Sequence, residues 1–271
     1  MSLSDRATIQ VHGATLAYEL AGSGPAVILL HGHLLDLRQW DSLFALLARS
    51  YQVLRYDARG FGESTLPALP FDHAADLHLL MQQLGLEHAW LIGSSGGGGI
   101  CLDFVLQYPH MVDGLVLAGS SIGGFVPRGQ IPGVLWELRE ALMQGEQARA
   151  VELSLQAFTA GPRRTIAQID PVVAERTRAM TARLYARPAV PAAVARALEP
   201  PAIERLGEIR VPTLVVLGGE DQQMVLDTGA VLAAQVRGAR QVIIPGAGHH
   251  PNLEQPEIFE ETVSAWLTRG G

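Results

Sequence analysis

The stretch LIGSSGGGGI, residues 91–100, ends an apolar run with two adjacent serines and four glycines. Centred on Ser95, it satisfies the pattern G-x-S-x-G, with Gly93 and Gly97 at the two glycine positions. Centred on Ser94, it does not. A strand that turns sharply into a helix strains the serine at the turn and exposes its hydroxyl, so the residues two before and two after it must be small. The pattern favours Ser95 as a nucleophile, and the alternative is a glycine-rich turn with a capping serine.

Short apolar segments rich in Val, Ile and Leu alternate with segments of helical periodicity along most of the chain. They predict a hairpin over residues 8–20 and strands at 26–32, 51–57, 89–95, 114–120, 213–219 and 240–246. Helices are predicted at about 39–49, 72–84, 97–108, 227–236 and 254–268. Continuous apolar strands that alternate with helices indicate an α/β fold with a mostly parallel central sheet flanked by helices.

Residues 121–205 interrupt this alternation. They contain no convincing strand and three helical stretches, VLWELREALMQG, ARAVELSLQAFTAG and PVVAERTRAMTARLYARP. Ligands of open α/β sheets bind beyond the carboxyl ends of the strands, so a helical block inserted after the sixth strand predicts a cap over a binding site. We therefore expect an α/β core, residues 1–120 and 206–271, and a helical cap or lid, residues 121–205.

Polar residues follow the last two predicted strands. Glu220 and Asp221 come after one, and His249 and His250 after the other. A nucleophilic serine needs a base and a group that orients the base. The chain order of serine, acid and histidine, each at the end of a strand, is the order described for α/β-hydrolases.

With these residues the chain resembles the α/β-hydrolase superfamily, in the capped branch of esterases, lactonases, carbon–carbon hydrolases and perhydrolases. The resemblance covers essentially the whole chain, through VILLHGHLLDLRQW, YDARGFGES, GSSGGG, GGED and GAGHHPNLEQPE. It implies Ser95 as the nucleophile, Asp221 as the acid and His249 as the base. Spacing from Gly218 favours Asp221 over Glu220.

The resemblance also implies an oxyanion hole made by two backbone N–H groups, those of His33 after the HG turn and of Gly96 after the nucleophile. His250 stands where the resembled family usually has an apolar residue. The side chains that we expect to border a substrate pocket are Trp136, Phe158, Met224 and His250.

Composition excludes several classes of function. The net charge of −7 gives no basic surface for nucleic acid, so we expect none as a partner. All basic residues are arginine, which rules out a catalytic, pyridoxal-phosphate or P-loop lysine. Cys101 is the single cysteine, so no internal disulfide forms. With no signal peptide and no long apolar run, we expect a cytoplasmic protein without membrane contact, and no cofactor.

The expected reaction is cleavage of a small or medium carboxylic ester or lactone through a Ser-His-Asp triad and an acyl-enzyme. A carbon–carbon bond hydrolase, a perhydrolase or an acyltransferase would use the same triad, and the sequence leaves the acyl acceptor open. A small-molecule sensor of the same fold is the alternative outside enzymes. Metal binding at His31, His33 and Asp36 is disfavoured, because the tight H-x-H-x-D-H spacing is absent. The oligomeric state is not readable from the sequence.

Overall fold

A computed structural model describes residues 6–127 and 132–270. Within them, eight strands form a sheet in the order β1-β2-β4-β3-β5-β6-β7-β8. β1 and β2 form the predicted hairpin, β2 pairs antiparallel with β4, and the other neighbours are parallel. The bounds are β1 (Ala7–Val11), β2 (Ala14–Ala21), β3 (Ala26–Leu30), β4 (Gln52–Tyr56), β5 (Ala89–Ser94), β6 (Val112–Ala118), β7 (Thr213–Gly218) and β8 (Arg240–Ile244).

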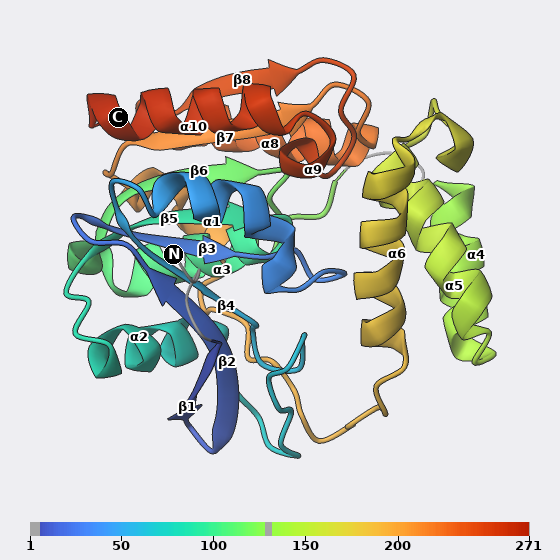
Figure 1. Cartoon of the computed structure of the whole chain (residues 1–271), viewed down its shortest axis with the longest axis horizontal. Coiled ribbons are helices and arrows are strands. Elements are labelled where there is room, and N and C mark those ends of the chain that lie inside the picture. The colour runs from blue at the N-terminus through green and yellow to red at the C-terminus, as the bar shows by residue number, and fades with distance from the viewer. Residues whose placement is uncertain (1–5, 128–131, 271) are drawn as a thin grey trace.

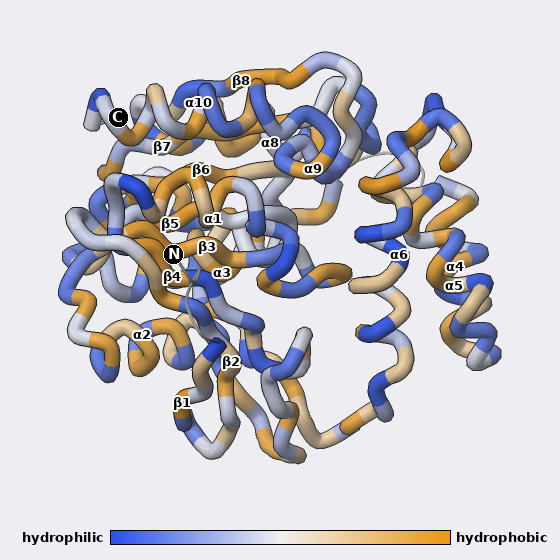
Figure 2. The backbone as a smooth tube through the Cα atoms, viewed as in Figure 1, coloured by the Kyte–Doolittle hydropathy of each residue, from blue (hydrophilic) through white to orange (hydrophobic). Residues whose placement is uncertain are grey.

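Helices cover both faces of this sheet (Figure 1). One face packs against α1 (Asp41–Leu47) and α10 (Pro256–Arg269), and the other against α2 (His73–Gln83), α3 (Gly96–Gln107) and α8 (Gln223–Gln235). The sequence of β3 is continuously apolar because its side chains alternate between two buried cores. Val27 and Leu29 join the core on the α1 side, Ile28 and Leu30 join the other core, and all five of its residues are buried. Figure 2 shows the apolar strands between the more polar outer surfaces of the helices.

The long insertion lies between β6, the sixth strand, and β7, as the sequence predicted. It contains α4 (Gly133–Met143), α5 (Gln147–Ser154), a π-helix (Leu155–Ala160), α6 (Pro171–Tyr185) and the short α7 (Ala202–Arg205). Figure 1 shows α4, α5 and α6 together beside the end of the sheet toward which the parallel strands run. The domain boundaries at residues 121 and 205 stay predictions.

Hydrogen bonds and ion pairs fasten α6 to the loops after β3 and β4. Arg176 pairs with Asp41 at 2.5 Å, and the Thr181 hydroxyl donates to the Leu34 carbonyl at 3.3 Å. Arg187, just beyond α6, donates to the carbonyl of Gly62 at 2.7 Å. These contacts hold the inserted helices over the ends of the strands. Among the described residues, no helix combines the length and the apolar character that crossing a bilayer would require.

Candidate active site

Ser95 occupies a strained turn between β5 and α3. Its φ is +50° and its ψ is −118°, a conformation that costs a non-glycine residue about 1–3 kcal/mol. A Cβ built on Gly93 would lie 2.6 Å from the Gly97 carbonyl oxygen, and one on Gly97 would collide with the carbonyl of Leu30. Ser94, by contrast, is fully buried at the end of β5. The structure therefore has the strand–serine–helix turn that the G-x-S-x-G register at Ser95 implies.

His249 and Asp221 meet at the ends of β8 and β7. His249 Nδ1 lies 2.8 Å from Asp221 Oδ2, and both side chains are almost fully buried. A carboxylate only accepts hydrogen bonds, so Nδ1 carries the proton and Nε2 of the neutral ring is an acceptor. Asp221 Oδ1 accepts a further bond from the Gln222 N–H at 2.7 Å. Glu220, the other acid considered, pairs instead with Arg163 at 2.9 Å.

The surroundings favour the protonated form of His249. Burial by itself opposes a charged imidazole, but the Asp221 carboxylate beside it and the charge of Glu254 raise its pKa above the ordinary value. A base with a raised pKa accepts a proton readily, and Asp221 stabilises the imidazolium that forms.

The π-helix (Leu155–Ala160) is hydrogen-bonded to the loops that carry His249 and Asp221. The His249 N–H donates to the Phe158 carbonyl at 3.1 Å, and the Gln222 side chain donates to the Ala157 carbonyl at 2.8 Å. The sequence analysis missed this part of the site. A π-helix has no sequence signature comparable to the elbow pattern, because its residues read as ordinary helix.

A partly buried ion pair holds the same loop from the other side. Arg164 Nη1 lies 2.8 Å from Glu254 Oε2, and Glu254 Oε1 accepts the Gly248 N–H at 2.8 Å. Arg164 also donates to the carbonyl of Gly246 at 2.8 Å. The sequence analysis assigned no role to either charged residue. The only available signal was Glu254 itself, inside the quoted stretch GAGHHPNLEQPE.

The HG turn after β3 is held by side chains. The Gly32 N–H donates to Gln39 Oε1 at 2.8 Å, and Gln39 is in turn bonded to Asn252. The His33 ring packs on Gly96, where a Cβ would collide with it. In the described part of the chain, neither the His33 N–H nor the Gly96 N–H is used in a hydrogen bond. The two residues that carry these N–H groups are thus in contact through the His33 ring, and both adjoin Ser95.

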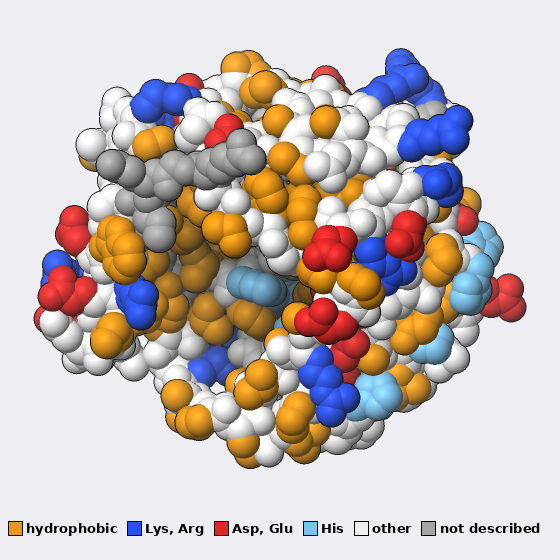
Figure 3. Space-filling model, turned by 180° about the vertical axis from the view of Figure 1, so that it is seen from behind, with side chains coloured by type: hydrophobic (Ala, Val, Ile, Leu, Met, Phe, Trp, Pro, Cys, Tyr) orange, Lys and Arg blue, Asp and Glu red, His pale blue; other side chains and the backbone are white. Residues whose placement is uncertain are grey.

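A cleft with two lobes adjoins the serine. Ser95, Phe158 and His249 line both lobes. The first, the Met224 lobe, has a volume of about 250 Å³, and Met224, Phe125 and Leu135 border it. The second, the His250 lobe, has about 290 Å³, and His250, Leu34 and Leu138 border it. Most of these side chains are apolar. Figure 3 shows a hollow in this part of the surface, edged largely by hydrophobic side chains, with a histidine at its floor.

Three of the four expected pocket residues, Phe158, Met224 and His250, line this cleft. His250 is 3% exposed, its Nδ1 has no hydrogen-bond partner among the described residues, and burial with the neighbouring His249 lowers its pKa. Trp136 does not line this cleft. Its side chain is 52% exposed on the outside of α4, where the Arg139 guanidinium lies 5.8 Å from its ring. Leu135 and Leu138 take the inward face of α4, and Trp136 is rotated away from that face.

Two of the three residues considered for a metal have other partners. His31 uses both ring nitrogens: Nε2 accepts the Ala58 N–H at 3.0 Å and Nδ1 donates to the Gly32 carbonyl at 2.8 Å. Asp36 pairs with Arg38 at 2.6 Å. Across residues 6–127 and 132–270, no group of three or more His, Cys, Asp or Glu side chains is arranged to hold a metal ion.

A mostly parallel sheet flanked by helices, with a strained serine after one strand and a hydrogen-bonded Asp–His pair after two later ones, defines the α/β-hydrolase class. Comparison with known sequences agrees. The chain belongs to the alpha/beta hydrolase family, whose sequence profile matches residues 27–262.

Relatives of this chain differ in their described activities. A putative non-heme chloroperoxidase of Synechocystis is 29% identical over 91% of this chain and 90% of its own length. A 2-hydroxy-6-oxo-6-phenylhexa-2,4-dienoate hydrolase of Burkholderia cepacia is 26% identical over 92% of this chain and 90% of its own length. The solved structure of a thermophilic esterase from Thermogutta terrifontis covers 98% of this chain and 99% of its own, at 27% identity and a TM-score of 0.78.

An uncharacterized protein of Mycobacterium tuberculosis is more similar over a shorter range. It is 35% identical over 113 residues, which are 41% of this chain and 33% of that protein. This match spans only a third of that relative's length. The family is therefore established as one of hydrolases, and the reaction of this chain has to be argued from its own site.

Proposed function

We propose that this chain is a serine hydrolase that cleaves small or medium carboxylic esters or lactones. One observation carries the proposal: Ser95, in its strained turn, lines the same cleft as His249, whose Nδ1 is held by Asp221 at 2.8 Å. In this arrangement a serine hydroxyl and the free nitrogen of a neutral imidazole face one substrate space.

The proposed mechanism has two stages. His249 Nε2 takes the Ser95 proton while Oγ attacks the carbonyl carbon, and the resulting oxyanion accepts hydrogen bonds from the His33 and Gly96 N–H groups. The imidazolium then gives its proton to the departing alkoxide, which leaves the acyl group on Ser95. Water, deprotonated by His249, attacks the acyl-enzyme and releases the acid. No cofactor takes part in this scheme.

The size and walls of the cleft, and the fold of a related esterase, support an ester or lactone of modest size as the substrate. Its lobes have volumes of about 250 and 290 Å³ and mostly apolar walls, which suit short acyl and alkyl groups. The esterase from Thermogutta terrifontis has the same fold. Perhydrolysis and acyl transfer use the same three residues and are alternatives for the final acceptor, whereas carbon–carbon hydrolysis is an alternative for the bond that is cleaved.

The test is turnover of a p-nitrophenyl ester panel by the purified protein and by Ser95→Ala. Loss of the nucleophile is expected to lower kcat by a factor on the order of 10⁶, and Ser94→Ala serves as the matched control. A serine-directed phosphonate should label the protein at Ser95 only. Full esterase activity in Ser95→Ala would refute the mechanism. Ligand-induced stabilisation without any product from the whole panel would favour a sensor.

A further inference from the structure

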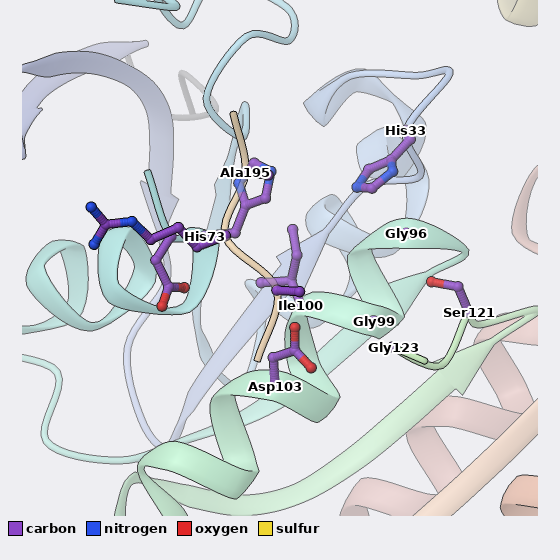
Figure 4. Close-up of a pocket in the computed structure, with 12 residues that line it drawn as sticks. His33, His73, Gly96, Gly99, Ile100, Asp103, Ser121, Gly123 and Ala195 are labelled. Atoms are coloured by element: carbon purple, nitrogen blue, oxygen red, sulfur yellow. The ribbon is translucent and has the colours of Figure 1, made fainter. Parts of the chain in front are cut away.

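A third cavity, separate from the two lobes around Ser95, lies on the other side of His33 and has a volume of about 270 Å³ (Figure 4). We call it the Asp103 chamber. The residues that matter for its chemistry are His33, Asp72, His73, Asp103, Ser121 and Arg196. The extended segment after α6 closes it, because Arg196 N–H donates to the Phe71 carbonyl at 2.7 Å and holds residues 195–197 there. Nothing in the proposed mechanism uses this space.

Asp103 is the unusual group in the chamber. It projects from α3, and its Oδ1 is buried without a hydrogen-bond partner among the described residues. Figure 4 shows its carboxylate and the His33 ring facing the same space. A buried carboxylate oxygen without a donor carries a desolvation cost that a bound donor would remove. Burial, together with the charge of Asp72, raises the pKa of Asp103 to about 6, so the group is mostly ionised at neutral pH.

The two histidines beside Asp103 bring no positive charge to it. Burial lowers the pKa of His33 to about 4 and that of His73 to about 3, so both rings are neutral at pH 7. Arg196 lines the chamber but forms no ion pair with Asp103 in the described part of the chain. The lining thus holds two carboxylates, those of Asp103 and of Asp72, which caps α2 by accepting the Ala74 N–H at 2.8 Å, and one guanidinium. This balance favours a ligand group that donates hydrogen bonds or carries positive charge.

The chamber adjoins the proposed reaction centre through two shared residues. His33 lines both the chamber and the His250 lobe, and Ser121 lines both the chamber and the Met224 lobe. Gly99 keeps this boundary open, since a Cβ there would lie 2.7 Å from the Ser121 hydroxyl. A glycine inside α3 is otherwise unfavourable by about 1 kcal/mol. The need for space beside Ser121 explains why a glycine occupies position 99.

We propose that the Asp103 chamber binds a hydroxyl or protonated amine carried by the substrate, with Asp103 as the acceptor. Esters with such a group at the far end of their alcohol or acyl portion are the preferred substrate class. That the substrate is an ester rests on the proposed function, whereas the binding of the donor group does not. Asp103 would act in specificity, because it meets the substrate away from the reacting carbonyl.

The kinetic test compares matched esters. One arm pairs ω-hydroxyalkyl butyrates, with alkyl chains of two to six carbons, with alkyl butyrates in which a methyl replaces the hydroxyl. The other arm places the same groups on the acyl chain of ethyl esters, which identifies the portion that enters the chamber. At the fitting length, kcat/KM is expected to favour the hydroxyl ester by about 10-fold or more.

Two variants test whether Asp103 causes the preference. Asp103→Leu, which removes the acceptor, should bring the ratio of kcat/KM for the two esters to about 1, and Asp103→Asn, which keeps a neutral acceptor, should lower it only in part. Glu87→Gln, which removes an exposed carboxylate before β5, is the matched control and should keep the ratio. The inference is overturned if the native protein shows no preference at any length in either arm, or if the preference persists in Asp103→Leu. A merely structural role of Asp103 would lower both rates alike and leave the ratio unchanged.

A binding measurement separates this inference from the proposed mechanism. Titration of Ser95→Ala with 6-aminohexan-1-ol and with hexan-1-ol should give a Kd about 10-fold lower for the amino alcohol, and adding Asp103→Leu should remove the difference. Equal affinities for the two alcohols would count against the chamber, whatever the esterase activity. Full esterase activity in Ser95→Ala, combined with selective binding of the amino alcohol, would overturn the mechanism and keep the chamber.

Discussion

The loops at the ends of the strands and the inserted helices contribute differently to the site. Ser95, Asp221 and His249 all follow strands of the buried sheet, and backbone hydrogen bonds fix the turns that carry them. The insertion is built less tightly, since large apolar side chains such as Met143 and Val172 are more than two-thirds exposed on it. The comparison suggests that the sheet sets the reaction and that the insertion sets which molecules fit.

The π-helix is an exception to this division of roles between the sheet and the insertion. The Phe158 carbonyl accepts the His249 N–H, and Arg164, which follows the π-helix, pairs with Glu254 beside the histidine loop. The insertion therefore reaches the proposed base through its backbone and one ion pair. Substitutions at the strand ends should affect the reaction itself, those at the π-helix should affect the position of the base, and those on the outer face of α4 should affect neither.

The largest of these effects is expected at Asp221. Asp221→Asn should lower kcat by a factor on the order of 10⁴, because an amide can turn its N–H toward Nδ1 and favour the wrong tautomer of His249. The matched control is Glu220→Gln, which removes only the surface pair with Arg163. Steady-state kinetics on one p-nitrophenyl ester are sufficient. Equal losses in the two variants would mean that the two acids have been assigned wrongly.

The pH dependence of activity tests the electrostatics around His249. The base must be neutral, so kcat/KM should fall about tenfold per pH unit below its pKa. Asp221 and Glu254 raise that pKa despite burial, which places the midpoint above the ordinary value of 6.5. Glu254→Gln should move the midpoint to lower pH, and the exposed Glu257→Gln should not. A midpoint in Glu254→Gln at or above that of the native protein would contradict the assigned cause.

A smaller loss is expected where the insertion holds the histidine loop. Arg164→Ala removes the partner of the partly buried Glu254 and the bond to the Gly246 carbonyl. Displacing the base by a fraction of an ångström should lower kcat by about 10- to 100-fold and also lower the melting temperature. Arg163→Ala, at a side chain that is 55% exposed, should change stability by less than about 1 kcal/mol. If kcat is unchanged in Arg164→Ala, the loop is held by its backbone bonds alone.

The sequence predicted the sheet well, because the strands leave strong local patterns. Continuous apolar runs mark the strands, and the observed strands after the hairpin end only one or two residues before the predicted ends. The one or two residues between an observed strand end and its predicted end include the HG turn after β3 and Ser95 of the elbow after β5. The spacing from Gly218 favoured Asp221 over Glu220 as the predicted acid.

The missed features depend on how distant segments pack. The π-helix reads as ordinary helix in the sequence, and Arg164 meets Glu254 across 90 residues of chain only once the insertion has folded. Asp103 lies in a helix whose sequence gives no sign that the segment around Arg196 returns to cover it. Such contacts cannot be read from a local pattern.

The smallest effect is expected at Trp136, which is 52% exposed on the outer face of α4. The apolar residues Leu135, Leu138 and Ala141 recur at helical spacing and mark the inward face of α4, and Trp136 stands one residue away from that phase. Trp136→Ala should change kcat/KM less than twofold and stability by about 0.5 kcal/mol. Leu138→Ala, the matched change on the inward face, should cost about 2 kcal/mol or more and shift the preferred acyl length by enlarging the His250 lobe. If the two variants altered substrate preference equally, α4 would meet the substrate with a different face from the one that the structure presents.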